Sequence, residues 1–193
     1  MKKRNIAIFA SGSGTNAQRI IEYFSGNPKI SVALILSNKP DAYVLVRAKN
    51  LNVPAVVFDR HSFYETDDII KLLKKEKIDF IVLAGFLWMV PVNLILAYHG
   101  RIINIHPALL PKYGGKGMYG ERVHEAVIQS GDKVSGISIH YVNEKYDEGD
   151  IIFQVKCEVL QNDTPNSLAQ RVHQLEYKHY PEVIEKLVRG LNL

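Results

Sequence analysis

The sequence contains one cysteine, no long apolar run and no low-complexity tract. Because Cys157 stands alone, it excludes an intramolecular disulfide and a multi-cysteine metal site, and it suits a reducing, cytoplasmic location. The longest apolar stretch, residues 81–92, is too short to span a bilayer. Residues 6–10 follow a basic N-terminus but are too few for the apolar part of a signal peptide. We therefore expect a soluble protein that does not act at a membrane.

A strong excess of one charge is also missing. The formal net charge is +4, and the basic residues are spread along the chain. The densest group, Lys71, Lys74, Lys75 and Lys77, is typical of the exposed face of a helix. Such a charge favours a small anionic substrate over a nucleic acid. Since no Pro- or Gly-rich linker divides the chain, we expect a single domain over residues 1–193.

The first half of the chain alternates short apolar strands with amphipathic helices. Strands are predicted at 5–10, 31–36, 54–58, 80–84 and 101–105, and helices at 15–24, 42–50, 66–75 and 91–98. Thr15 or Asn16 is expected to cap the first helix. This alternation predicts a mostly parallel sheet with helices on both faces.

The pattern changes after Gly131. Two β-rich runs, 134–142 and 151–160, are joined by a connection too short for a parallel crossover, so we expect an antiparallel pair. A last helix is predicted over 166–189, and Pro181 is expected to kink or divide it. The predicted fold class is therefore α/β, a Rossmann-like sheet with an antiparallel strand pair at its C-terminal end.

A glycine-rich segment, residues 11–17, joins the first strand to the first helix. Glycines allow close approach of the backbone to a ligand, and a helix N-terminus favours an anion, so a phosphate is the natural occupant. The spacing also fits a dinucleotide fingerprint. That alternative requires an acidic residue at the end of the second strand, where Ser37, Asn38 and Lys39 stand instead. A tight turn without any ligand remains the third interpretation.

Two further segments carry candidate catalytic groups. Asn104 and His106 lie at the carboxyl end of the fifth predicted strand, where open α/β sheets bind ligands, and their spacing places them on one face. A histidine can move protons near neutral pH, and an amide can hold a carbonyl oxygen, although a strand-end histidine is often structural. Asp147, in the acidic turn 146–150, can hold His106 protonated or oriented, unless that turn is only a solvated one.

Four segments in this order, 11–16, 83–86, 104–111 and 147–149, resemble the glycinamide ribonucleotide formyltransferase family of folate-dependent enzymes. The resemblance covers almost the whole chain, and the segment Asn-x-His-Pro-x-Leu-Leu-Pro is its most specific part. It implies that Asn104, His106 and Asp147 are the catalytic group. It also implies transfer of a formyl group from 10-formyltetrahydrofolate, as co-substrate, to glycinamide ribonucleotide in purine (IMP) synthesis.

The resemblance also assigns the binding residues. Gly14, Thr15 and Asn16 are expected to hold the substrate phosphate, and Glu176 the glycinamide end. The expected folate site comprises Leu87, Trp88, Met89, Val90, Asn104, Asn143, Glu144, Lys145, Tyr146 and Asp147. Two features depart from the family: Trp88 stands where an arginine is common, and the segment 117–122 is longer than the commonest bacterial form.

Relatives with the same core include an RNA-contacting formyltransferase with an added C-terminal domain and a folate hydrolase with an added N-terminal one. A first strand at Asn5 and a last residue at Leu193 leave room for neither, so the ribonucleotide enzyme is favoured. The expected reaction is direct attack of the substrate amine on the formyl carbon, through a tetrahedral intermediate. Asn104 and a protonated His106 are expected to stabilise its oxyanion without a metal. A monomer or a homodimer is equally compatible with the sequence.

Overall fold

The structure, a computed structural model, describes residues 3–191. Its strands form a single seven-stranded sheet in the order β3-β2-β1-β4-β5-β6-β7. The strands are β1 (Arg4–Phe9), β2 (Ile30–Ser37), β3 (Ala55–Val57), β4 (Ile78–Leu83), β5 (Ile102–His106), β6 (Val134–Tyr141) and β7 (Ile151–Glu158). β3, β2, β1, β4 and β5 pair in parallel, as predicted from the alternating pattern.

The antiparallel pair predicted near the C-terminus is confirmed, because β6 and β7 pair antiparallel from Val134–Glu158 onwards. β6 is also antiparallel to β5, with Asn104 opposite His140 and His106 opposite Ser138. This second pairing is not predicted by the sequence patterns. It decides which side chains of β6 stand next to Asn104 and His106.

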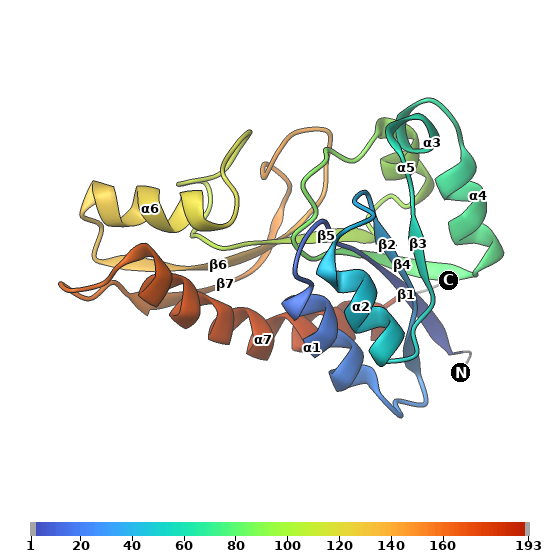
Figure 1. Ribbon diagram of the computed structural model, residues 1–193, viewed down its shortest axis with the longest axis horizontal. Coiled ribbons are helices and arrows are strands. Elements are labelled where there is room, and N and C mark those ends of the chain that lie inside the picture. The colour runs from blue at the N-terminus through green and yellow to red at the C-terminus, as the bar shows by residue number, and fades with distance from the viewer. Residues whose placement is uncertain (1–2, 192–193) are drawn as a thin grey trace.

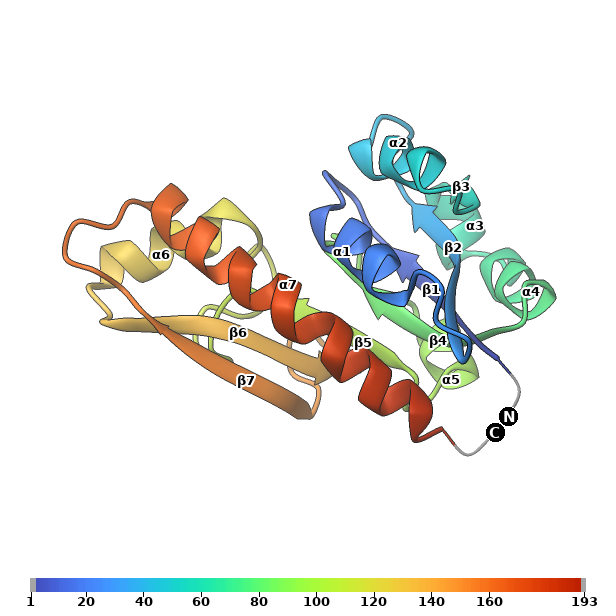
Figure 2. The same ribbon diagram turned by 90° about the horizontal axis from the view of Figure 1, so that it is seen from below.

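Helices cover both faces of the sheet (Figures 1 and 2). They are α1 (Thr15–Phe24), α2 (Tyr43–Asn50), α3 (Arg60–Tyr64), α4 (Asp68–Lys75), α5 (Val92–Ala97), α6 (Glu121–Ser130) and α7 (Pro165–Arg189). α3 and α6 are not among the predicted helices. One core cluster joins the sheet to α1, α2, α6 and α7, and a second joins it to α3, α4 and α5. Ile103 and Ile105 of β5 belong to the first cluster, so Asn104 and His106 are on the other face of the strand.

The expected cap of α1 and the expected division of α7 are wrong. The residue that caps α1 is Gly14, with φ of 73° and no side-chain cap, rather than Thr15 or Asn16. α7 is not divided at Pro181 but continues through it to Arg189. Tyr180 and Pro181 are buried, and the Tyr180 hydroxyl donates to the carbonyl of Leu83 at 2.8 Å, so packing on the sheet holds the helix together. No helix within residues 3–191 is long and apolar enough to cross a membrane.

Candidate active site

A cavity of about 830 Å³ lies where the β1–α1 loop, the β4–α5 loop, the end of β5 and the β6–β7 connection meet. This size is in the range of small-molecule sites. The carboxyl ends of β1, β4 and β5 meet at one edge of the sheet, where open α/β sheets bind ligands. The Ser11 hydroxyl joins two of the loops, because it accepts from the Leu87 N–H at 3.0 Å and donates to Asn38 at 2.7 Å.

Asn104, His106 and Asp147 come together in the wall of this cavity, as predicted. Nδ1 of His106 is 3.5 Å from Oδ2 of Asp147, and Nδ2 of Asn104 is 3.5 Å from Oδ1 of the same carboxylate. Asp147 is held in turn by the N–H of Gly115, which donates to Oδ2 at 2.9 Å. The acidic turn therefore reaches the strand-end histidine instead of lying only in solvent.

The protonation of His106 is set by opposing effects. Burial lowers the pKa of His106, and the charge of Asp147 and the carbonyl of Tyr113 oppose that decrease without overcoming it. Nε2 lies 2.7 Å from the Tyr113 carbonyl, which only accepts, so Nε2 carries a hydrogen. A neutral ring then turns the lone pair of Nδ1 toward Asp147. Only the imidazolium can donate a hydrogen bond to both the Tyr113 carbonyl and the Asp147 carboxylate. A negative charge that develops in the cavity would favour the same charged form, since opposite charges attract.

The pKa of Asp147 lies below its ordinary value. Burial acts to raise it, but the bond with His140, the charge of His106 and the N–H of Gly115 together outweigh that effect. The carboxylate is therefore ionised at neutral pH, and it is the fixed negative charge of the cluster.

His140 is a member of the cluster that the sequence analysis missed. Its Nδ1 lies 2.8 Å from the carbonyl of Tyr141, which only accepts, so Nδ1 carries a hydrogen, and its Nε2 faces the cluster, 3.6 Å from Oδ1 of Asp147. Asn104 Nδ2 lies 3.1 Å from that Nε2, which fixes the orientation of the amide. His140 could have been found from the sequence only if the register of β5 and β6 had been known, since His140 stands directly opposite Asn104 in this antiparallel pair.

The glycine-rich loop also lines the cavity, including Gly14, Thr15 and Asn16. A Cβ added to Gly14 would lie 2.5 Å from Cβ of Val44, so α2 packs against the loop and only glycine fits. Lys39, Lys116 and Arg122 also line the cavity and bring positive charge to it. A dinucleotide site needs an acidic residue directly after β2. In this chain Asn38 and Lys39 stand there, and Lys39 lines the cavity.

Glu176 of α7 is 5% exposed and lines the same cavity. Its Oε2 accepts a hydrogen bond from Nδ2 of Asn16 at 2.8 Å. Burial raises the pKa of Glu176 to about 7, and the bond from Asn16 opposes this increase. A carboxyl group near half-ionisation at neutral pH can accept or donate a hydrogen bond to an amine or amide of a ligand. The sequence placed Glu176 only by resemblance.

The apolar wall is formed by Leu87, Trp88, Met89 and Val90, all of which line the cavity as expected. Trp88 packs against Phe58 with ring centres 6.0 Å apart, and the Arg60 guanidinium lies 5.1 Å from its ring centre. Among the expected folate residues on the β6–β7 connection, Asn143, Lys145, Tyr146 and Asp147 line the cavity. Glu144 is exposed and is not part of the lining.

His124 of α6 is a second lining residue that the sequence analysis did not single out. It is 2% exposed, its Nδ1 has no hydrogen-bond partner within the described part of the chain, and burial lowers its pKa to about 4. A buried, neutral imidazole nitrogen in a cavity wall offers a ligand an acceptor or a donor. Among residues 3–191, no group of three or more His, Cys, Asp or Glu side chains could hold a metal ion.

Comparison with known proteins gives a consistent picture. A family model described as "Formyl transferase" matches residues 4–184. A phosphoribosylglycinamide formyltransferase of Bacillus subtilis is 39% identical over 197 residues, which cover 100% of this chain and 97% of that protein. A chloroplastic one of Arabidopsis thaliana is 42% identical over 95% of this chain, which spans only 65% of its length. The crystal structure of the Bacillus halodurans phosphoribosylglycinamide formyltransferase superposes with a TM-score of 0.86, at 38% identity and covering 97% of this chain and 96% of that one.

Proposed function

This chain belongs to the formyl transferase family, and on that premise we propose that it transfers a formyl group from 10-formyltetrahydrofolate to the amine of glycinamide ribonucleotide. The observation that carries the proposal is the cluster of Asn104, His106 and Asp147 in a cavity that a glycine-rich loop and an apolar segment also line. The matching relatives from Arabidopsis thaliana and Bacillus subtilis are named phosphoribosylglycinamide formyltransferase, and we place the transfer in purine synthesis.

The two ends of the cavity suit the two substrates. We assign the ribonucleotide phosphate to Gly14, Thr15 and Asn16, where backbone amides at the start of α1 and the nearby Lys39 favour an anion. Glu176 is then placed to contact the glycinamide end, since it is bonded to Asn16 beside the phosphate loop. The cavity therefore has one anion-binding end and one buried carboxyl group next to it.

The folate ring system fits the opposite wall, formed by residues 87–90 together with the lining residues of the β6–β7 connection. Flat heteroaromatic rings bind in apolar clefts with a few polar groups at the edge, which is the composition of this wall. When bound there, 10-formyltetrahydrofolate supplies the formyl group. Glu144 has no place in this assignment because it lies outside the lining.

The chemistry follows from where charge develops. The amine attacks the formyl carbon, a tetrahedral intermediate with an oxyanion forms, and the bond from that carbon to the folate nitrogen then breaks. One N–H of Asn104 points to Nε2 of His140 at 3.1 Å, and the other makes only a long 3.5 Å contact with Oδ1 of Asp147, which it can exchange for a bond to the oxyanion. His106 contributes its positive charge, since both of its nitrogens face protein acceptors. Asp147 favours the imidazolium and holds a water that carries the amine proton to the departing nitrogen.

We further infer that residues 1–193 act as one formyltransferase domain in the cytoplasm, as a monomer or homodimer, on two small molecules. The single-domain inference is supported by the sheet, because all seven strands belong to one sheet. The lone Cys157 supports a reducing compartment.

The test is a formyl-transfer assay with glycinamide ribonucleotide and 10-formylfolate, without added metal. Product formation that depends on both substrates is the expected result. Separate titrations with a folate analogue and with a nicotinamide dinucleotide provide the comparison, and only the folate should bind. Hydrolysis of the folate without transfer to the amine would replace this proposal by a folate hydrolase, and tight binding of the dinucleotide alone would replace it by a dinucleotide-binding protein.

A further inference from the structure

The two groups that face the ring nitrogens of His106 share an unusual backbone conformation. Within residues 3–191, four non-glycine residues have positive φ, and Tyr113 (57°) and Asp147 (56°) are two of them. Tyr113 offers its carbonyl to Nε2 and Asp147 its carboxylate to Nδ1. The left-handed region is unfavourable for residues with a Cβ, so such residues persist only where the surroundings hold them.

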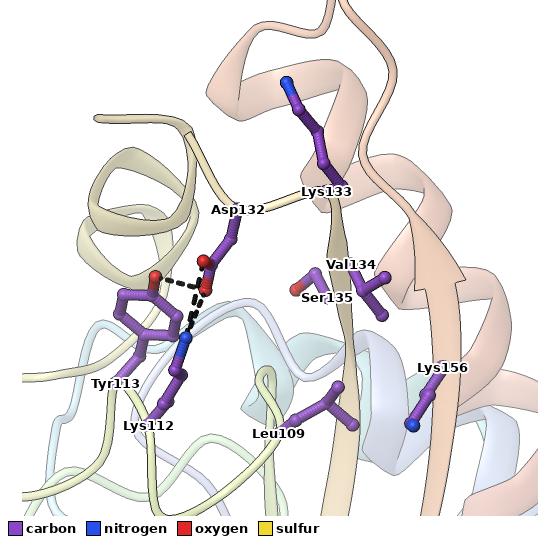
Figure 3. Close-up of a pocket in the computed structure, with 8 residues that line it drawn as sticks. All are labelled: Leu109, Lys112, Tyr113, Asp132, Lys133, Val134, Ser135 and Lys156. Atoms are coloured by element: carbon purple, nitrogen blue, oxygen red, sulfur yellow. Dashed lines mark hydrogen bonds and ion pairs between the residues drawn. The ribbon is translucent and has the colours of Figure 1, made fainter. Parts of the chain in front are cut away.

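For Asp147 the restraint comes from the neighbouring loop, because the Gly115 N–H donates to its carboxylate. For Tyr113 the restraint comes from its own side chain. The Tyr113 hydroxyl donates to Oδ2 of Asp132 at 2.7 Å, and Nζ of Lys112 lies 3.0 Å from the same oxygen (Figure 3). The hydroxyl also lies 2.5 Å from Oγ of Ser130, at the end of α6. Asp132 follows α6 in the turn before β6, so this bond ties the loop after β5 to a separate part of the fold.

Packing alone does not hold the Tyr113 ring. The ring and Asp132 border a second cavity of about 330 Å³, which also has Leu109, Val134 and Ser135 in its wall (Figure 3). The Tyr113 ring is partly buried against the first core cluster, and the open space beside it leaves the hydroxyl bonds to complete the restraint. Neither Tyr113 nor Asp132 lines the larger cavity with the catalytic cluster.

We propose that Tyr113 is a positioning residue: its bond to Asp132 fixes the backbone that aims the Tyr113 carbonyl at His106. The proposal rests on the proposed function for its kinetic readout, although its geometric part concerns His106 alone. Loss of the hydroxyl releases the carbonyl, and the imidazolium then loses one of its two acceptors. His106 is misplaced and less easily protonated, while the binding surfaces for both substrates stay in place.

The direction of the pH effect follows from the groups around His106. Asp147 favours the charged ring, and His140 on β6 disfavours it. Burial lowers the pKa of His124 on α6 to about 4, so its ring is neutral at pH 7. The Tyr113 carbonyl acts with Asp147 to raise the pKa of His106 against the effect of burial. Removing this acceptor therefore lowers the pKa of His106 further, so the ring is charged only at a lower pH than in the wild type.

The experiment compares Tyr113→Phe, Asp132→Ala and the double variant with the wild-type protein. Tyr23→Phe is the matched control, because the Tyr23 hydroxyl donates to Glu185 at the same 2.7 Å between α1 and α7. Lys112→Met tests whether the exposed ion pair matters by itself. Steady-state kinetics against pH are measured for each protein, and NMR titration of the His106 ring gives a second readout that needs no activity.

We expect Tyr113→Phe and Asp132→Ala each to lower kcat by about tenfold or more, with KM values little changed, since a small displacement of a catalytic group can cost up to about a hundredfold. The double variant should be no slower than the slower single one. Both single variants should shift the His106 titration to lower pH, and Tyr23→Phe and Lys112→Met should leave kinetics and titration unchanged. An unshifted His106 titration in folded Tyr113→Phe, or additive effects in the double variant, overturns the inference. A wild-type protein without formyl transfer instead overturns the proposed function, and the NMR comparison then decides the inference alone.

Discussion

Replacing Asp147 by asparagine keeps the shape of the side chain and removes its charge from beside His106. If Asp147 supports the imidazolium, the variant should bind both substrates normally and turn over slowly. The pKa of His106, already lowered by burial, falls further when the carboxylate that opposes this effect is gone. The charged form is then present only at lower pH, so the activity that depends on it is lost first at the alkaline side.

The size of the effect can be worked from the distance. At 3.5 Å between Nδ1 of His106 and Oδ2 of Asp147, two unit charges attract by about 5 kcal/mol at an effective dielectric constant of about 20, and by about 1 kcal/mol in bulk water. Because about 1.4 kcal/mol is a factor of ten, the charged fraction falls by roughly ten- to a thousandfold. Loss of the proposed proton relay adds to this, so we expect kcat to fall by about 10²–10⁴.

The assay is steady-state kinetics with a pH–rate profile for Asp147→Asn and for two neighbours in the same turn, Glu148→Gln and Asp150→Asn. Glu148 is exposed and pairs with Lys145 at the surface, and the Asp150 side chain is exposed as well. Both control variants should therefore be nearly as active as the wild type. If Asp147→Asn lowers kcat no more than its neighbours do, the carboxylate does not support His106 and the mechanism is wrong.

Three further changes test other parts of the site and fold. Gly14→Val places a Cβ against Val44 and forces a strained φ. It should raise KM for the ribonucleotide by roughly 10- to 100-fold, the cost of about one charged hydrogen bond, and equal damage to the folate KM would contradict the assignment. Because burial raises the pKa of Glu176 from 4.5 to about 7, folded protein keeps a proton there that unfolded protein loses. Stability should thus fall by about 3 kcal/mol as pH rises from about 4.5 through 7, and denaturant unfolding of Glu176→Gln should lack this slope. Cys157→Ala should cost about 1 kcal/mol of stability and leave kcat intact, because burial raises the pKa of this thiol and keeps it unreactive; an inactive, folded variant would indicate a covalent intermediate.

The fold was predictable where local pattern and global structure agree. Strands β1, β2, β4 and β5 are runs of branched apolar residues between turn signals, and each lies within about two residues of its predicted bounds. α6 was missed although Val123 and Val127 have helical spacing and Gly131 ends the helix in the left-handed conformation. A division of α7 at Pro181 was wrongly expected, because the rule that proline ends a helix considers only the local backbone and ignores the packing of Tyr180 on the sheet.

The sequence by itself determined the alternation of strands and helices, the position of the glycine-rich loop and the chemical nature of Asn104, His106 and Asp147, because these depend on residues close together in the chain. Only the tertiary structure decided that His140 holds Asn104 and that Tyr113 offers His106 its carbonyl. The first contact depends on the register between two antiparallel strands, and the second on the positive φ of Tyr113, whose hydroxyl is bonded to a side chain 19 positions away. The hydrophobic period and the turn composition of the sequence carry no information about these two contacts. The contacts depend on the direction of individual atoms after the core has packed.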